Sequence, residues 1–276
     1  MLYNTYFLYF IIYSFLGWVY ESTLCSLLEY NRIINRGFLI GPYCPIYGVG
    51  IIINWILFGE LKDPFIIFIA AGFISCAIEY VVSYIMEKLF NAKWWDYSHF
   101  PFNLNGRICL YGGLVFGAGS TVFIKCIHPV IMFGIDKIPN TYINWSTLVL
   151  GSLFITDIIL TVNSINSLNK KLKTFHDVLN QKVENTLDIL SDRINVLEES
   201  LNFEKGKGIM IKIHDMNSQI KEKELRLIKA FPHIRFIKYG SIGANICKKI
   251  EDETKRKNKC PEQDPDELEK VGTVIK

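Results

Sequence analysis

The sequence predicts an all-α protein: a polytopic transmembrane helical bundle of about five spans, followed by a cytoplasmic coiled-coil-like helical hairpin. Half of the 276 residues are hydrophobic, only 21% are charged, and the first twenty residues carry no charged side chain. Long apolar stretches recur until about residue 163, after which Lys, Glu, Asp and Asn dominate. This pattern excludes a secreted disulfide scaffold, a nucleic-acid-binding domain and an ordinary soluble enzyme.

The apolar stretches give the expected spans. A helix needs roughly 20 apolar residues to cross a hydrocarbon core about 30 Å thick. On that basis we expect spans at residues 5–28, 44–58, 65–89, 108–127 and 142–162. The second stretch is short and begins with glycine and prolines, so a tilted helix, a broken helix and a re-entrant hairpin all remain open for it.

The basic residues near the span ends predict the orientation. Lys and Arg follow the first, third and fifth stretches more often than the second and fourth. Because Lys and Arg are enriched in cytoplasmic loops, we expect the N-terminus outside and the C-terminus in the cytoplasm.

Beyond the fifth stretch the hydrophobic period becomes that of a soluble helix. We divide the chain into a transmembrane domain (1–163), a cytoplasmic helical hairpin (164–235) and a largely disordered tail (236–276). Each arm of the hairpin carries a stripe of apolar residues at steps of three, four or seven, and Glu204–Gly208 separate the arms. The first stripe is Leu168, Leu172, Phe175, Leu179, Val183, Leu187, Leu190, Ile194, Leu197 and Leu201, and the second is Ile209, Ile213, Met216, Ile220, Leu227 and Phe231.

Ionisable residues within the apolar stretches are candidates for a functional site, because each costs a few kcal/mol in a bilayer unless it is paired or hydrated. The strongest acidic candidates are Glu21, Glu79 and Asp157, with Glu87 weaker because it lies at a span end. In the expected orientation all of them lie in the cytoplasmic half, where they would form an acidic vestibule for a cation, a proton or a basic substrate. The alternative is that Arg36, Arg107 or Lys88 neutralises them and they only brace the bundle.

Two stretches between spans combine turn residues with aromatic and basic side chains, and both are expected on the cytoplasmic face. Glycine, proline and asparagine specify turns, whereas Trp and Tyr suit the headgroup interface. The arginines and asparagines are explained less well by anchoring alone, so a site at this face is a hypothesis of equal weight. Its candidate residues are Asn35, Gly37, Gly41, Pro42, Pro45, Trp95, Asp96, Tyr97, Asn103 and Asn105.

Other motifs favour structural roles or exclude activities. Gly113 and Gly117 form a G-x-x-x-G pattern that predicts close helix packing. No Cys/His/carboxylate spacing indicates a metal site, and the seven cysteines include no C-x-x-C pair, so we predict neither a metal nor a cofactor. The sequence contains no hydrolase signature and no phosphate-binding G-x-x-x-x-G-K-[ST] motif, so we expect no enzyme and no ATPase within this chain.

Several of these motifs together resemble one family. They are Gly17-Trp18-x-x-Glu21, the stretch from Asn35 to Gly48, Glu79-Tyr80 with Glu87, Trp95-Asp96-Tyr97-Ser98, and Pro101-Phe102-Asn103 followed by Gly106-Arg107-Ile108-Cys109-Leu110. Over residues 5–160 this pattern resembles the CmpB-type ABC-transporter permeases of Firmicutes. The resemblance implies a bacterial cytoplasmic membrane protein and a separate ATPase subunit as partner, and it does not cover the helical tail.

We therefore expect a transport permease component that acts in the lipid bilayer, as a homo-oligomer or with a partner membrane subunit, because about five spans make a small transporter. The alternative is a membrane-anchored interaction protein that recruits a cytoplasmic partner through its helical tail. A third hypothesis, an intramembrane enzyme using Glu79, Asp157 and His99, lacks a nucleophile paired with a base. Nucleic acid is not an expected partner.

Overall fold

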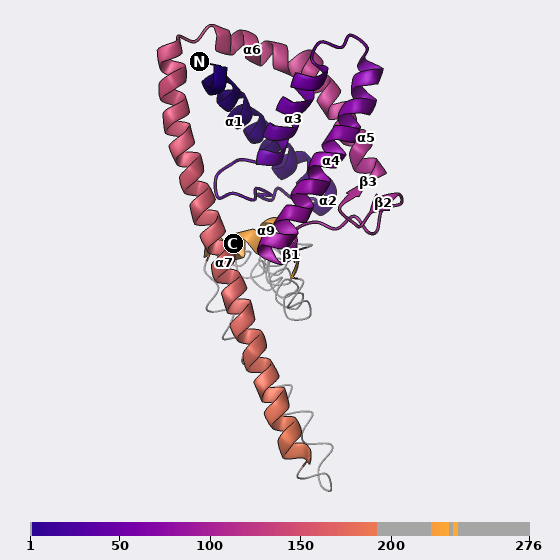
Figure 1. Cartoon of the computed structure of the whole chain (residues 1–276), viewed down its shortest axis with the longest axis vertical. Coiled ribbons are helices and arrows are strands. Elements are labelled where there is room, and N and C mark those ends of the chain that lie inside the picture. The colour runs from indigo at the N-terminus through magenta and orange to yellow at the C-terminus, as the bar shows by residue number, and fades with distance from the viewer. Residues whose placement is uncertain (1, 192–221, 232–233, 237–276) are drawn as a thin grey trace, which may run out of the picture.

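The computed structural model describes residues 2–191, 222–231 and 234–236, and most of these residues are helical. Its long helices run between the two ends of a bundle (Figure 1). In chain order the helices are α1 (Leu2–Tyr20), continued by the π-helix η1 (Glu21–Cys25) and α2 (Ser26–Tyr30), then α3 (Pro45–Phe58), α4 (Pro64–Phe90), α5 (Leu110–Val122), continued by the π-helix η2 (Phe123–Ile127) and α6 (His128–Asp136), which lies across one end of the bundle, and α7 (Asn140–Ser191).

Four helical stretches of the described chain are long and apolar enough to cross a membrane. They are Tyr3–Glu29, Pro64–Phe90, Leu110–Asp136 and Asn140–Thr174. The expected second span is instead the 14-residue helix α3. At 1.5 Å per residue it is about 21 Å long, short of the roughly 30 Å of a hydrocarbon core. Of the about five expected spans, four are thus long helices, and the second, for which a tilted helix, a broken helix and a re-entrant hairpin were open, is one short helix.

Local sequence signals fix the helix boundaries. The Asp63 side chain accepts a 2.8 Å hydrogen bond from Phe65 N, and Pro64 follows at the first helical position of α4. Pro45 occupies the same position in α3. Asn31 and Asn91 adopt left-handed φ values of 52° and 51° directly after α2 and α4. Asparagine tolerates this conformation better than most residues, so it ends both helices.

Two irregular segments leave the helices at the same end of the bundle (Figure 1), and we call them linker 1 (residues 31–44) and linker 2 (residues 91–107). Linker 2 contains the strands β1 (Ala92–Lys93) and β2 (Asn103–Leu104), and β2 pairs antiparallel with β3 (Ile108–Cys109). β1 pairs antiparallel with β4 (Arg235–Phe236), with Ala92 opposite Phe236 and Lys93 opposite Arg235. A segment from near the end of the described chain thus closes onto linker 2.

Each end of the bundle has its own hydrophobic core. Near the N-terminal end, Tyr9 and Tyr13 of α1 pack with Phe123, Ile135 and Ile143. At the opposite end lies a cluster that we call the linker core, contributed by α4, linker 2, α7, α9 (Glu222–Ala230) and β4. Its buried members are Phe90, Ala92, Trp94, Ile165, Leu168, Leu172, Leu227, Ile228, Ile234 and Phe236.

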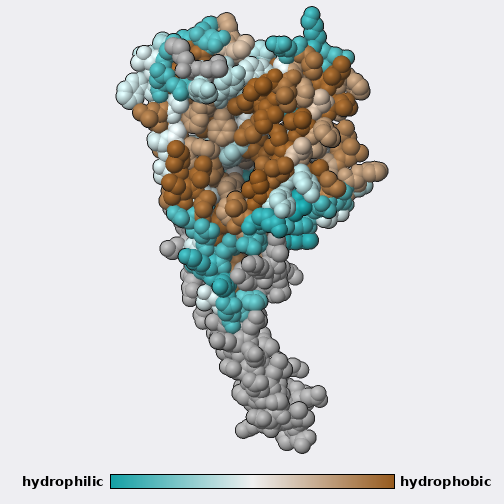
Figure 2. Space-filling model, viewed as in Figure 1, coloured by the Kyte–Doolittle hydropathy of each residue, from teal (hydrophilic) through white to brown (hydrophobic). Residues whose placement is uncertain are grey.

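Between these ends the outer surface is apolar. Large side chains of α4 point outward, with Phe65, Phe73 and Val81 exposed to 70%, 76% and 54%. Figure 2 shows hydrophobic side chains gathered over the body of the bundle and hydrophilic ones toward its two ends. An exposed apolar surface of this extent bounded by polar ends is the surface expected in contact with a lipid bilayer.

Helix α7 passes through residue 163 without a break and continues to Ser191. Leu168 and Leu172 of the first apolar stripe and Leu227 of the second meet in the linker core. The structure shows no coiled coil among the residues it describes. The remainder of the expected hairpin, residues 192–221 and 232–233, and nearly all of the expected disordered tail, residues 237–276, lie outside the described residues.

Candidate functional site

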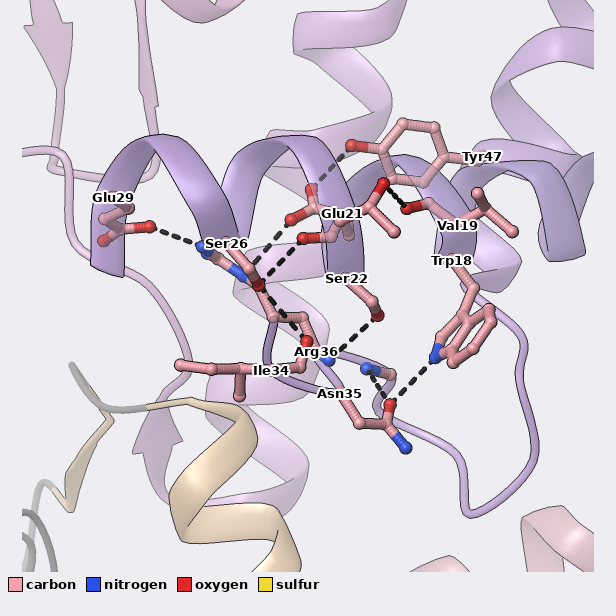
Figure 3. A network of polar contacts seen from close by, with 12 residues as sticks. Trp18, Val19, Glu21, Ser22, Ser26, Glu29, Ile34, Asn35, Arg36 and Tyr47 are labelled. Atoms are coloured by element: carbon pink, nitrogen blue, oxygen red, sulfur yellow. Dashed lines mark hydrogen bonds and ion pairs between the residues drawn. The ribbon is translucent and has the colours of Figure 1, made fainter. Parts of the chain in front are cut away.

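The carboxylate of Glu21 lies where α1 changes into the π-helix η1, and it is held from two sides (Figure 3). The Tyr47 hydroxyl donates a 2.6 Å hydrogen bond to Glu21 Oε1, and Arg36 Nε lies 3.3 Å from Glu21 Oε2. Arg36 also pairs with Glu29. Glu21 and Arg36 are both about one quarter exposed. The expected neutralisation of a membrane acid by an arginine is thus the geometry found at Glu21.

Linker 1 is positioned on this network by short polar contacts. Asn35 Oδ1 accepts hydrogen bonds from Trp18 Nε1 at 2.8 Å and from Gly37 N at 3.0 Å. Arg36 N donates to Ser22 Oγ at 3.2 Å. Figure 3 shows these groups on the side of α1 and η1 that faces linker 1. Asn35 and Gly37 therefore hold the backbone that presents Arg36.

A glycine allows Tyr47 to reach Glu21. A Cβ atom added to Gly17 would lie 2.4 Å from Tyr47 Cβ, which is closer than two non-bonded carbon atoms approach each other. Gly17 lies one helical turn before Glu21, so the tyrosine ring crosses α1 at the glycine and its hydroxyl meets the carboxylate of the next turn. The G-W-x-x-E spacing thus has a packing reason.

Glu79 is the most buried of these acids, with 6% of its surface exposed. Its carboxylate accepts a 3.1 Å hydrogen bond from the hydroxyl of Tyr97 in linker 2. Burial raises the pKa of Tyr97 well above its ordinary value, and the charges of Glu79 and Glu21 raise it further. Both carboxylates therefore act on this phenol. Among the described residues, no lysine, arginine or histidine forms an ion pair with Glu79.

Arg107 does not join Glu21 or Glu79 but pairs with Glu87. Arg107 Nη2 lies 2.8 Å from Glu87 Oε2, and its guanidinium stands over the rings of Tyr80 and Tyr84, 5.3 and 5.5 Å from their centroids. Trp95 Nε1 donates to the Arg107 carbonyl at 3.1 Å. A paired and stacked arginine of this kind fastens linker 2 to α4.

The remaining polar residues of linker 2 hold its turns. Asp96 Oδ1 accepts hydrogen bonds from the amide and hydroxyl of Ser98, and Asp96 Oδ2 lies 2.9 Å from Arg235 Nη1. The Ser98 hydroxyl lowers the pKa of Asp96 most, and the Arg235 charge lowers it further. Asn103 Nδ2 donates to the Phe100 carbonyl at 2.8 Å, and Asn105, with φ of 55°, donates to the Tyr80 hydroxyl at 3.0 Å.

Asp157 of α7 binds the backbone of linker 1. Its Oδ1 accepts a 2.9 Å hydrogen bond from Ile40 N, and its Oδ2 accepts a 2.7 Å bond from Gly41 N. A Cβ atom on Gly41 would lie 2.9 Å from Asp157 Oδ2 and 2.5 Å from the Tyr43 ring, so this approach requires glycine. Pro42 and Pro45 then lead the chain into α3.

Residues near the end of the described chain contact both linkers, and the sequence patterns gave no signal for Glu224, Arg226 or Arg235 among them. The Arg226 guanidinium donates to the carbonyls of Gly37 and Phe38 at 3.1 and 3.2 Å. Lys171 of α7 lies 2.6 Å from Glu224 of α9, which is 1% exposed. Burial lowers the pKa of Arg226, and the charge of Asp157 opposes that effect, so both groups act on the same part of linker 1.

Residues 8–162, more than half of the chain, match the family described as Putative ABC-transporter type IV. The chain belongs to this family. The resemblance seen in the motifs is thereby confirmed, and the matched region ends within α7, before the tail segment that binds the linkers. No match was found among curated proteins or among solved structures.

In this ABC-transporter family member the candidate residues separate into four groups. Glu21 joins Arg36, Glu79 joins Tyr97, Arg107 joins Glu87, and Asp157 joins the linker 1 backbone. Gly113 and Gly117 lie in α5 where it packs against α4: a Cβ on Gly117 would be 2.4 Å from the Phe68 carbonyl oxygen. No group of three potential metal ligands occurs within the part of the chain that the structure describes.

Proposed function

We propose that this chain is a transport component of the membrane in which Glu79 binds and releases a proton or a small monovalent cation. The observation that carries the proposal is a nearly fully buried carboxyl group whose described hydrogen-bond partner is a neutral phenol. An ionised carboxylate left uncompensated at such a position costs several kcal/mol. A proton or a bound cation removes that cost, whereas Glu21 and Glu87 are compensated by arginines.

The surroundings of Glu79 suit reversible binding. Tyr97 reaches it from linker 2, and the charge of Glu21 acts on the same phenol. A change in the position of linker 2 would therefore change the hydrogen bond to Glu79 directly. Because the linkers lie at one end of the bundle, a partner that binds at that end would change the hydrogen bond between Tyr97 and Glu79 (Figure 1).

Infrared difference spectroscopy of the full chain in lipid nanodiscs tests the proposal. Exposed Asp and Glu side chains are ionised above about pH 6. Between about pH 6 and about pH 9 the wild type should therefore lose the band of one protonated carboxylic acid, and Glu79→Gln should show no such loss. Adding Na⁺ or K⁺ at constant pH separates the two ligands: loss of the band on addition indicates a cation site, and an unchanged band indicates a proton site.

Glu60→Gln is the matched control, because Glu60 is an exposed carboxylate in the turn after α3. Its spectrum should equal that of the wild type. If the Glu79→Gln spectrum kept the same titrating band, Glu79 would not be the site. Proton or rubidium uptake into liposomes containing each variant would then show whether binding is linked to movement across the membrane.

We include a separate ATPase subunit in the proposal for two reasons: the chain belongs to an ABC-transporter family, and its sequence contains no G-x-x-x-x-G-K-[ST] motif. We propose that such a subunit docks at the linkers or on α7. Purification of the tagged chain from native membranes, followed by mass spectrometry, would recover a nucleotide-binding subunit if this is right. A homo-oligomer without such a subunit would favour ion-coupled or channel-like transport.

The length of α7 favours a second candidate function, a membrane-anchored protein that recruits a cytoplasmic partner. The helix has 52 residues, about 78 Å, although about 20 residues suffice to cross a bilayer. The test compares the proteins captured by the full chain with those captured after removal of residues 164–276. A partner lost with these residues supports recruitment, and an unchanged set of partners supports the bundle as the functional part.

A further inference from the structure

The segment formed by α9 and β4 makes specific contacts with both linkers, far from it in sequence. Arg226 lies 189 and 188 residues from the two carbonyls that it binds in linker 1. Nine to ten residues later, β4 pairs with β1 of linker 2, and Arg235 binds Asp96. One short piece of chain is thus attached to linker 1 at one point and to linker 2 at another.

Aromatic side chains join these attachment points into one packed unit. The Trp94 ring of linker 2 has its centroid 5.0 Å from that of Phe38 in linker 1 and 5.0 Å from that of Phe231. Both contacts are edge-on, and Phe90 closes the group at 5.9 Å from both Phe38 and Trp94. Trp94 is 4% exposed. The two linkers therefore touch each other in the same cluster that receives Phe231.

The attachments lie directly beside Arg36 and Tyr97, the linker residues that contact Glu21 and Glu79; we call these four residues the acidic site. Arg226 binds the carbonyls of Gly37 and Phe38 in linker 1. The residue before Gly37 is Arg36, which pairs with Glu21. Arg235 binds Asp96 in linker 2. The residue after Asp96 is Tyr97, whose hydroxyl donates a hydrogen bond to Glu79. A displacement of the segment would therefore move Arg36 relative to Glu21 and Tyr97 relative to Glu79.

We propose that residues 222–231 and 234–236 form a strap whose Arg226 and Arg235 are positioning residues for the acidic site, so that release of the strap loosens both linkers together. An effect of the strap on ion binding rests on the proposed role of Glu79. The mechanical coupling between the strap and the two linkers does not. Arg226 suits the task because its fork reaches two adjacent carbonyls, which a lysine ammonium cannot match. In the absence of the strap, linker 1 keeps Asp157 and linker 2 keeps Arg107 as their own attachments.

Hydrogen–deuterium exchange of the full chain in nanodiscs tests the coupling without any substrate. Arg226→Ala, whose contact is on linker 1, should accelerate exchange about tenfold or more in residues 36–41 and also in residues 92–98. Arg235→Ala, whose contact is on linker 2, should also accelerate exchange in both segments, but to a smaller extent, because the Arg235 side chain is 73% exposed. Arg226→Lys should recover part of the protection. Lys229→Ala, an exposed position on the same helix, should leave both segments unchanged.

If each variant accelerated exchange only in its own linker, the strap would not couple them and the proposal would be overturned. The same variants are then titrated by the infrared band of Glu79. A shift in its midpoint in both arginine variants, with the total band conserved, shows that the strap positions the site. If the wild type shows no Glu79 band, the proposed ion site fails, and the exchange result still decides whether the strap exists.

Discussion

Asp157 accepts a 2.7 Å hydrogen bond from the amide of Gly41 across 116 residues of chain, and a second bond from the neighbouring amide. Hydrogen bonds to a charged group contribute about 1.5–3 kcal/mol each. We therefore expect Asp157→Ala to lower the free energy of unfolding by about 3 kcal/mol, and Asp157→Asn by less because one oxygen remains. Thermal unfolding in mild detergent measures both, with Thr156→Ala, an exposed neighbour, as control. Equal stability of Asp157→Ala and Thr156→Ala would show that linker 1 does not depend on this carboxylate.

The α4–α5 contact should tolerate no side chain at Gly117. A Cβ there would lie 2.4 Å from the Phe68 carbonyl oxygen, and a backbone atom cannot move aside as a flexible side chain can. Gly117→Ala is expected to cost about 1–3 kcal/mol. Gly119→Ala provides the matched control, because a Cβ at Gly119 meets nothing within 4 Å and alanine favours the helix. A pair of unfolding curves with the same midpoint would contradict the close packing.

Arg107 should not be replaceable by lysine. Its guanidinium bonds Glu87 and stands over two tyrosine rings, and its side chain is only 13% exposed. Arg107→Lys keeps the charge but loses the planar group, so we expect a loss of about 1–2 kcal/mol in unfolding free energy. A double-mutant cycle with Glu87→Gln should give a coupling energy of about 1–3 kcal/mol. Additive effects of the two changes would mean that the ion pair contributes nothing to holding linker 2.

The contacts of Asp96 should weaken in acid. Its pKa is lowered in the folded chain by the Ser98 hydroxyl first, so the ionised carboxylate adds stability above its unfolded pKa of about 3.9. That stability is lost as the pH falls through the lower folded pKa. We expect Asp96→Asn to unfold at a lower temperature than the wild type at pH 7, and the difference to shrink from about pH 5 to about pH 3. A difference independent of pH would locate the effect of the substitution elsewhere.

The orientation of the chain can be tested with single accessible positions. With the N-terminus outside, the turn after α3 faces the outside and linker 2 faces the cytoplasm. In intact cells, a membrane-impermeant maleimide should label Glu60→Cys and leave His99→Cys unlabelled until the membrane is opened; both positions are exposed. The unsubstituted chain, with its seven cysteines, gives the background. The reverse labelling pattern would invert the expected topology.

The helices of the bundle were predictable because their signals are local. Apolar length defines α1, α4 and α7, and Pro64 and Asn91 mark the ends of α4. The same signals predicted α3 as residues 44–58, within one residue of its limits, but a 14-residue apolar helix does not reveal whether it spans the whole bilayer. The sequence therefore predicted this helix and left its passage through the bilayer open.

The site was predictable only in its residue types. Intramembrane acids and nearby arginines are visible in the sequence, but the choice of partner depends on the path of each linker. Glu79 is 18 residues from Tyr97, and the spacing alone favours neither that partner nor an arginine. Arg226 lies in a charged helix with no motif, and its target is a pair of backbone carbonyls, which leave no sequence pattern.

The unbroken course of α7 makes it a lever with its pivot near the site. Leu172 is packed in the linker core, and Ser191 lies 19 residues further along the same helix, about 28 Å away. A tilt of about 10° around Leu172 would move the position of Ser191 by roughly 5 Å. A small displacement at the linkers is thus amplified at the far end of the helix. A protein bound at that end would in turn act on the linkers through this lever arm.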